Sequence, residues 1–327
     1  MELTCTAQAP SATHALPADN RRERLRSFLE AYWLRPENAL WMTLRSLTLA
    51  SCPLPEPSAD LACGDGVFTF LHHGGRFAEA FDVFCAVGHL DQVVSRNADM
   101  FDAAGDGYFP VIARRAARRI GLGADLKAEL LKKAARLELY DELIRCDANE
   151  PLPLADQSLA SVYCNSAYWI GRIERFLREL HRVVRAGGQI VLHVKLSDMH
   201  AWTLERFERQ LGRRFLDIID RGRWGCWPTV APRAEWERRF ARAGLEIVDV
   251  RPLASSTHAH VWDVGLRPLA PLLVRLANGV SPADRLAIKR DWVALMLELA
   301  EPLCRCDLDL VEDGAAPAEL QYVLTPR

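Results

Sequence analysis

The amino-acid sequence predicts an α/β fold, a doubly wound and mostly parallel sheet with a helical cap. Short apolar runs alternate with amphipathic helical segments from residue 58 to residue 252, the pattern of parallel strands joined by crossover helices. Several of these runs end in an acidic or small residue. Two long segments, at about 67–117 and at 253–315, interrupt the alternation, and both are interpreted as cap elements over the strand ends.

The two helices expected first lie between Arg21 and Leu49, because apolar residues recur there at helical spacing around Pro36. A proline-rich link then leads into the first strand. The remaining elements are expected as strands at 58–63, 118–126, 141–148, 158–167, 189–196, 245–253 and 318–326, and helices at 127–139, 172–188 and 234–244. The glycine pair Gly187 and Gly188 is expected to close the helix at 172–188. The chain therefore divides into a helical lid (1–57), an α/β core (58–252) with an insertion at about 67–117, and a cap with the final core strand (253–327).

Length, composition and charge restrict the possible partners. The chain has 327 residues, half of them hydrophobic, which is ample for a substantial core. Its 41 Lys and Arg against 43 Asp and Glu give a formal charge of −2, so there is no overall electrostatic reason to expect a nucleic acid, and a small molecule is the expected partner. No apolar run is long enough for a bilayer and no signal peptide begins the chain, so we expect a cytoplasmic protein without membrane contact.

The nine cysteines are scattered, and several lie inside apolar runs, as expected for reduced core thiols. Cys304 and Cys306 are too close together for a usual zinc knuckle and have no partner pair. No metal site is therefore predicted.

A glycine-containing turn and two acids carry the chemical signal. In "DLACGDG", the small residues Ala62, Gly64 and Gly66 follow a strand and allow a ligand to approach the backbone. Asp125 ends the next strand, where a carboxylate can accept both hydroxyls of a ribose. Asp147 ends the strand after that and is placed to accept from an adenine amino group. Either acid alone is equally a cap or a turn residue, but together they favour a nucleoside site.

In this order, "DLACGDG", "GLGADL", "CDANEPLPLADQSLASVYCNSAYWI" and "FLRELHRVVRAGGQIVLHV" resemble the class I S-adenosylmethionine-dependent methyltransferases. The resemblance covers 58–70, 118–196 and 232–252. It implies a Rossmann-like sheet of the seven-strand type, S-adenosyl-L-methionine as cofactor and methyl transfer as the activity. The cofactor-binding residues that it implies are Asp60, Ala62, Cys63, Gly64, Gly66, Asp125, Leu126, Asp147, Ala148, Asn149 and Asn165.

Two departures from the family pattern matter. Ala62 stands where the family usually has its first glycine, and residues 67–117 greatly lengthen the distance from the turn to the ribose acid. The lengthening makes Asp82, near the ordinary distance, a rival for that role. We prefer Asp125 because a helix and "CDANEPLP" follow it directly.

A methyl group on a sulfonium is already activated, so positioning of the acceptor is the main requirement. A hydroxyl or protonated amine acceptor also needs a general base, for which histidine suits neutral pH. The candidates are His258 and His260, after the strand at 245–253, and His200, after the strand at 189–196. For each, a surface loop position is the alternative. His181 and His193 are expected to be packing residues.

Aromatic residues gather near the same strand ends, where they are suited to stack on an acceptor or surround a cation. The predicted pocket residues are Tyr168, Trp169, Trp202 and Trp262, with packing of the cap as the alternative for each. Arg35, in the predicted lid, is suited to pair with the methionine carboxylate, or else is a solvated arginine. The basic run "RRAARR" at 114–119 is expected on the solvated face of a helix, with contact to phosphate or an acidic substrate as the alternative.

Together these features predict a metal-independent methyltransferase acting on a small molecule, with specialised metabolism as a plausible setting. They leave oxygen, nitrogen or carbon open as the accepting atom, and they leave the oligomeric state open. One alternative is a non-catalytic relative that binds S-adenosylmethionine. Another is an NAD(P)-dependent oxidoreductase, which is disfavoured because the turn lacks the further glycine that pyrophosphate binding prefers.

Overall fold

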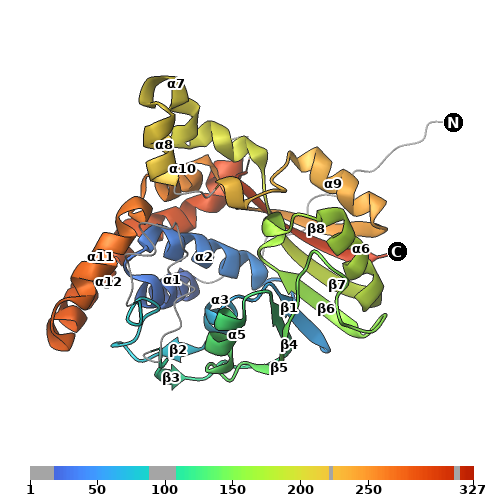
Figure 1. Ribbon diagram of the computed structural model, residues 1–327, viewed down its shortest axis with the longest axis horizontal. Helices are drawn as coiled ribbons and strands as arrows, with labels where there is room; N and C mark the ends of the chain where they lie inside the picture. The colour runs from blue at the N-terminus through green and yellow to red at the C-terminus, as the bar shows by residue number, and fades with distance from the viewer. Residues whose placement is uncertain (1–17, 88–107, 221–223, 313–316) are drawn as a thin grey trace.

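A seven-stranded sheet in the order β5-β4-β1-β6-β7-β9-β8 forms the centre of the protein (Figure 1). The computed structural model describes residues 18–87, 108–220, 224–312 and 317–327. The strands of this sheet are β1 (Ser58–Leu61), β4 (Ile120–Asp125), β5 (Tyr140–Arg145), β6 (Leu159–Cys164), β7 (Val184–Lys195), β8 (Leu245–Ala254) and β9 (Glu319–Pro326). β9 runs antiparallel to both its neighbours, and the other pairings are parallel. The predicted fold class is confirmed.

The chain winds away from β1 in two directions. It passes through β4 to β5 on one side and through β6 and β7 toward β8 on the other. Because crossovers between parallel strands are right-handed, opposite directions place the connecting helices on opposite faces. These helices are α3 (Val67–His72) and α5 (Ala128–Ala135) on the first side, and α6 (Ile173–Val183) and α9 (Arg233–Arg242) on the second. The direction switches between β1 and β6, which is where such sheets bind ligands.

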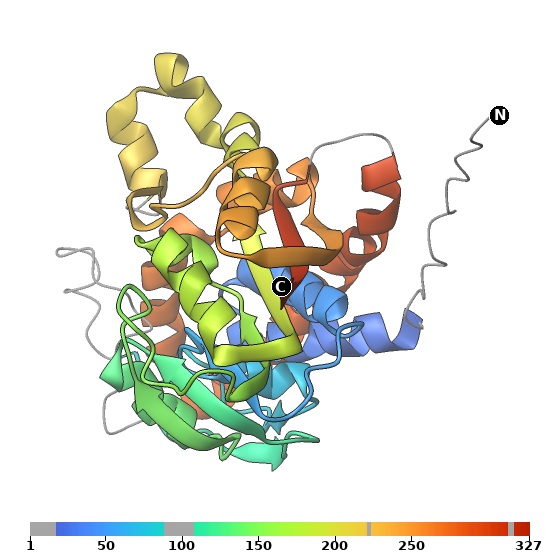
Figure 2. The ribbon, with the colours of Figure 1, turned by 90° about the vertical axis from the view of Figure 1, so that its right-hand side faces the viewer.

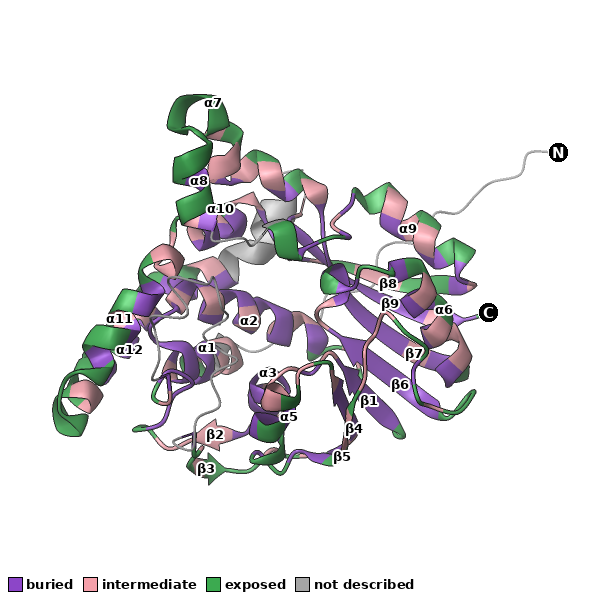
Figure 3. Ribbon diagram, viewed as in Figure 1, coloured by how far each residue is buried: buried purple, intermediate pink, exposed green. Residues whose placement is uncertain are grey.

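The two predicted N-terminal helices are α1 (Ala18–Tyr32) and α2 (Pro36–Leu49). Pro36 occupies the first turn of α2, where its missing N–H and fixed φ suit a helix start. α2 contacts α1, α3, α10 and β8, and most of its side chains are buried (Figure 3). α2 therefore belongs to the layer that covers the sheet.

The predicted cap at 253–315 is helical within the described residues. It contains α10 (Ser256–Val264), a 3-10 turn (Arg267–Leu269), α11 (Ala270–Asn278) and the long α12 (Pro282–Glu312). α12 packs along α1, and α11 and α12 lie together along one side of the molecule (Figures 1 and 2).

A further excursion after β7 was not foreseen. It consists of 3-10 turns at Ser197–Trp202, Leu204–Phe207 and Trp224–Cys226, with α7 (Glu208–Leu211) and α8 (Arg213–Asp220) between them. α7 and α8 project from the body of the protein above α10 (Figure 1). Their short, polar sequences lack the long apolar period that makes a helix conspicuous.

Two local predictions are wrong. Gly187 and Gly188 do not close a helix, because α6 ends at Val183 and both glycines lie within β7. Gly188 is required there for close packing, since a Cβ at this position would lie 2.9 Å from the Ala160 carbonyl oxygen. The run at 114–119 is not helical. It starts at the end of β3 (Ile112–Arg114), which pairs antiparallel with β2 (Arg76–Phe77). Arg118 and Arg119 of this run form ion pairs with Glu56 and Asp141.

His193 is fully buried inside β7, as expected for a packing residue. Its Nε2 lies 2.9 Å from the Gln321 side-chain oxygen on β9. Burial lowers the pKa of His193 to about 4, so the ring is neutral at physiological pH. None of the helices in the described ranges is long and apolar enough to cross a membrane.

Candidate cofactor and acceptor site

The turn after β1 adopts a backbone that favours glycine. Ala62, Gly64 and Gly66 all have left-handed φ values, of 57°, 60° and 73°. A Cβ on Gly64 would meet no atom within 4 Å, whereas one on Gly66 would lie 3.1 Å from the Tyr140 ring and 3.2 Å from Leu137. Gly64 therefore faces open space that a ligand can enter, and Gly66 allows the turn to pack against the sheet.

Ala62→Gly is expected to stabilise the protein. The left-handed conformation costs an L-residue roughly 1–2 kcal/mol, and glycine avoids this cost. Against this, glycine gives the unfolded chain more conformational entropy than alanine does, which lowers stability by about 0.4–1 kcal/mol. The balance predicts a gain of about 0.5–1 kcal/mol in the free energy of unfolding, measured by urea denaturation. Gly64→Ala is the matched opposite change and is expected to destabilise. A loss of stability in Ala62→Gly would contradict this account of the turn.

The Asp125 carboxylate connects this turn with the end of β4. Its Oδ2 accepts a hydrogen bond from the Gly64 N–H at 2.9 Å, and its Oδ1 accepts one from the Lys127 N–H at 2.8 Å. A carboxylate has about four acceptor positions, so these two bonds leave capacity for two ribose hydroxyls. Beside it, the Leu126 side chain is 49% exposed. An acid joined to the turn, with an apolar side chain uncovered next to it, fits an adenosine.

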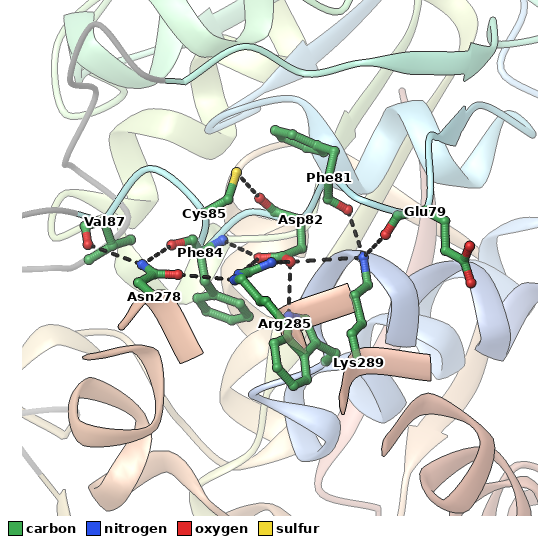
Figure 4. Close-up of polar contacts among 10 residues, drawn as sticks. Glu79, Phe81, Asp82, Phe84, Cys85, Val87, Asn278, Arg285 and Lys289 are labelled. Carbon is green, nitrogen blue, oxygen red and sulfur yellow. Dashed lines mark hydrogen bonds and ion pairs between the residues drawn. The ribbon is translucent and has the colours of Figure 1, made fainter. Parts of the chain in front are cut away.

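Asp82, the rival ribose acid, lies in a different environment (Figure 4). It is fully buried, and its two carboxylate oxygens accept hydrogen bonds from the Arg285 guanidinium of α12 at 2.7 and 2.9 Å. The Trp33 indole also donates to it at 2.9 Å. Asp82 therefore holds the segment at 78–87 against α12, and Asp125 remains the ribose ligand that we propose.

Further contacts fasten the same segment. The Lys289 ammonium donates to the carbonyl oxygens of Glu79 and Phe81 at 2.7 and 2.8 Å (Figure 4). The Asn278 amide donates to the Phe84 carbonyl at 3.0 Å. The described start of the insertion is thus tied to α11 and α12 through its backbone as well as through Asp82.

Asp60 lies beneath the turn and faces the interior. It is buried, and its Oδ2 accepts hydrogen bonds from the Thr69 hydroxyl at 2.5 Å and from the Tyr140 hydroxyl at 2.7 Å. Burial raises the pKa of the Asp60 carboxyl to about 6 despite these two bonds. Asp60 therefore joins β1 to α3 and β5 beneath the turn.

Asp60→Asn is expected to change how stability depends on pH. A carboxyl whose pKa is higher in the folded than in the unfolded state stabilises the fold most when pH is below its unfolded pKa of about 3.9. This stabilisation is lost as pH rises through the folded pKa of about 6. A shift of about 2 units corresponds to roughly 3 kcal/mol. The stability of the variant relative to the wild type should therefore rise between pH 4 and pH 6, as measured by urea denaturation at each pH. A difference that stays constant over this range would contradict the raised pKa.

The other predicted cofactor residues lie around the same strand ends. The Asp147 Oδ1, just beyond β5, accepts hydrogen bonds from both the backbone and the side-chain N–H groups of Asn149, each at 2.8 Å. Asp147 is thus a turn residue as well as an adenine candidate. Cys63 and Ala148 are part of these two turns, and Asn165 directly follows β6, where its Oδ1 accepts from the Ser166 hydroxyl. Arg35 is buried in an ion pair with Glu37, so it already has an internal partner.

The three candidate bases differ in their surroundings. His258 is buried, completes the capping box of α10 with Ser255, and its Nε2 lies 3.1 Å from the Leu303 carbonyl oxygen. Burial also lowers the pKa of its ring, so its position is a structural one. His260 is exposed. The Nδ1 of half-buried His200 lies 2.7 Å from the Glu205 carboxylate, which orients its ring. Of the three, we therefore propose His200 as the base.

Four aromatic rings surround the Lys195 ammonium at the end of β7. Their centroids lie 3.9 Å (Trp41), 4.9 Å (Trp227), 5.3 Å (Tyr168) and 5.3 Å (Trp262) from Nζ. The Trp227 and Trp262 rings are stacked, with centroids 5.5 Å apart. We call these four rings with Lys195, Glu319 and Arg45 the charged aromatic cage.

Glu319, the first residue of β9, is the anion of the cage. Its Oε1 accepts from the Arg45 Nε and its Oε2 from the Lys195 Nζ, each at 2.8 Å. The Trp41 indole donates to Oε2 at 2.6 Å, and Arg45 donates to the Tyr168 hydroxyl at 2.8 Å. Burial raises the pKa of Glu319, but Arg45 and Lys195 outweigh this and lower it to about 2. Glu319 is therefore ionised at any physiological pH.

The cage contains two of the four predicted pocket residues, Tyr168 and Trp262. The other two lie nearer the surface, since Trp169 is 49% exposed and Trp202 is half-buried. Sequence reasoning missed Lys195, Arg45 and Glu319. The available signal was a charged residue at the edge of each otherwise apolar strand, "QIVLHVKL" and "ELQYVL", and an arginine inside the apolar face of α2.

Residues 102–192 match the model of a family described as a methyltransferase domain. Among solved structures, geranyl diphosphate C-methyltransferase from Streptomyces coelicolor A3(2) is similar at 12% identity and a TM-score of 0.40, over 90% of this chain and 84% of the other. The protein bound by the Trm112 methyltransferase activator of Haloferax volcanii is similar at 14% identity and a TM-score of 0.42, over 95% and 98%. The [4+2]-cyclase SpnF is similar at 16% identity and 0.40, over 82% and 73%. No curated protein sequence matches the chain.

The fold and the family match define a class I methyltransferase domain with the seven-stranded sheet expected of it. The match at residues 102–192 supports the predicted S-adenosylmethionine-dependent methyltransferase, a domain that takes S-adenosylmethionine as cofactor. A methyl acceptor is therefore its second ligand.

Proposed function

We propose that the protein transfers a methyl group from S-adenosylmethionine to a small molecule bound at the charged aromatic cage. The position of the cage supports this most. Lys195 ends β7, and Tyr168 follows β6 by four residues, so both lie at the sheet edge that carries the cofactor turn. β7 is two strands from β1, or roughly 10 Å at the usual strand spacing. A cofactor held at the turn can then direct its methyl group toward the cage.

A small acceptor is favoured over a macromolecule because the cage is enclosed. Trp41 and Arg45 come from α2 and Trp262 comes from α10, so helices from both predicted lid elements contribute to it. All seven residues of the cage are buried. A water-excluded cluster of aromatic rings suits a compact, unsaturated molecule. Specialised metabolism remains the setting that we propose.

In the proposed reaction, a nucleophilic atom of the acceptor forms a bond to the methyl carbon while the bond from sulfur to that carbon breaks. S-adenosylhomocysteine leaves with the electron pair of the broken bond. If the nucleophile carries a proton, we propose that the His200 imidazole accepts it, with the Glu205 carboxylate stabilising the resulting imidazolium. Most of the rate enhancement then comes from positioning the acceptor in line with the breaking bond.

The test is transfer of labelled methyl groups. The protein is incubated with methyl-labelled S-adenosylmethionine and either the ultrafiltered small-molecule fraction or the macromolecular fraction of a cell extract. Label is expected in the small-molecule fraction. Label in protein or RNA alone would overturn the small-acceptor proposal. Binding of S-adenosylhomocysteine without any label in either fraction would favour the non-catalytic alternative.

A further inference from the structure

The charged aromatic cage already contains a cation. Rings arranged around an ammonium at 3.9–5.3 Å, with a carboxylate at 2.8 Å, resemble sites that recognise cationic ligands. Here the chain's own Lys195 takes that position. A cationic acceptor must therefore displace Lys195 from the rings and from Glu319 before it can bind.

The sign of the local charge opposes a second cation. Lys195 and Arg45 both lie within hydrogen-bonding distance of Glu319, on different carboxylate oxygens. With the Glu319 carboxylate these two cations leave a net charge of +1, which repels an added ammonium and attracts an anion. In a buried site these interactions are screened far less than in water. The net charge therefore favours an anionic group over a cationic one.

The rings define the rest of the ligand. Trp227 and Trp262 are the least buried of the cage side chains, at 7% and 8% exposure. They are therefore the side chains that an entering ligand displaces most readily. Their stacked indoles offer flat apolar surface to an aromatic or conjugated body. Trp262 lies on α10, which is not part of the sheet, so its ring can move without disturbing a strand.

We propose that the acceptor carries an anionic oxygen, as a carboxylate or a phenolate, on an aromatic body, and that Lys195 binds this oxygen and so determines acceptor specificity. This proposal rests on the proposed function, since it assigns the substrate class of the same site. Lys195 is a specificity-determining residue in this account, with Arg45 and Glu319 holding its ammonium in position.

The test uses matched aromatic probes that differ only in charge. Benzoate is compared with benzylammonium, and 1-naphthoate with 1-naphthylmethylammonium, by calorimetric titration of the full chain saturated with S-adenosylhomocysteine. The wild type is expected to bind each carboxylate at least ~10-fold more tightly than its ammonium counterpart, a modest share of the interaction of a close buried charge pair. A preference for the ammonium, equal binding, or no binding of any probe overturns the proposal.

Lys195→Ala supplies the decisive comparison. Removing the ammonium empties the cation position beside Glu319, so the preference is expected to reverse in favour of the ammonium probes. Lys195→Arg keeps the charge and should keep the preference for carboxylates, which also decides the question if the alanine variant fails to fold. Lys132→Ala, which removes an exposed lysine of α5, is the matched control and should change nothing. An unchanged preference in Lys195→Ala overturns the proposal.

The outcome is distinguishable from failure of the proposed function. Methylation of amines rather than of anionic acceptors would overturn the inference on Lys195 but leave a small-molecule methyltransferase. Methylation of macromolecules alone would overturn the proposed function, whatever the probes show. Affinity for S-adenosylhomocysteine, measured in each variant, reports separately on the cofactor site.

Discussion

Replacing Asp125 with alanine is expected to weaken the binding of S-adenosylhomocysteine by ~100-fold or more. The reason is the loss of a carboxylate suited to accept two ribose hydroxyls, since hydrogen bonds to a charged group contribute about 1.5–3 kcal/mol each. The substitution also removes the acceptor for the Gly64 and Lys127 N–H groups, which loosens the turn. Calorimetric titration measures the effect.

Asp141→Ala is the control for Asp125. Asp141 lies on the neighbouring strand β5, but its side chain is exposed and pairs with Arg119, so its removal should leave cofactor affinity unchanged. Asp82→Ala is expected to destabilise the protein, because it leaves the Arg285 guanidinium without its carboxylate. If Asp125→Ala bound the cofactor normally, the ribose site would have to lie elsewhere.

Replacing Glu319 with glutamine is expected to lower the free energy of unfolding by about 3–5 kcal/mol, the usual cost of removing one partner from a buried ion pair. Glu319 accepts from Arg45, Lys195 and Trp41 inside the cage. The amide has nearly the same shape but carries no charge, so two buried cations lose their adjacent anion. Urea denaturation at neutral pH measures the change.

The contribution of Glu319 to folding stability is also expected to depend on pH. The pKa of Glu319 is lowered to about 2 in the folded protein, against about 4.3 in an unfolded chain. Its stabilising contribution is therefore complete above pH 4.3 and is lost as pH falls toward 2, by about 3 kcal/mol in all. The difference between wild type and Glu319→Gln should shrink over that window. Glu246→Gln, at an exposed position of β8, should show neither effect, and a Glu319→Gln variant as stable as the wild type would contradict this assignment.

The sheet and the cofactor turn were predictable from sequence because their signals are local. A small turn after one strand and an acid at the end of the next are read from a few adjacent residues, and the structure joins Gly64 to Asp125 across 61 positions by a hydrogen bond. The parallel order of strands also follows from their alternation with helices. The place of β9 did not follow, because antiparallel insertion between β7 and β8 leaves no local pattern.

The cage was only partly predictable for the same physical reason. Tyr168 and Trp262 were found because aromatic residues beside strand ends are conspicuous. In the sequence, Lys195 and Glu319 resemble ordinary charged residues at the ends of strands. Only the register that pairs them across β7 and β9 shows that they contact each other in the interior. His258, predicted as a candidate base with a surface loop position as the alternative, is instead a buried capping residue of α10 in contact with α12, which no local pattern indicates.

The place of β9 in the sheet sets an order in which the two halves of the active site can assemble. The turn and Asp125 need only the first half of the chain, whereas the cage joins Arg45 to Glu319 across 274 positions. Contacts between such distant residues form late, because the intervening chain must first be ordered. A chain emerging from the ribosome can thus acquire the proposed nucleoside site well before the proposed acceptor site, and methyl transfer at the cage would await the closing strand.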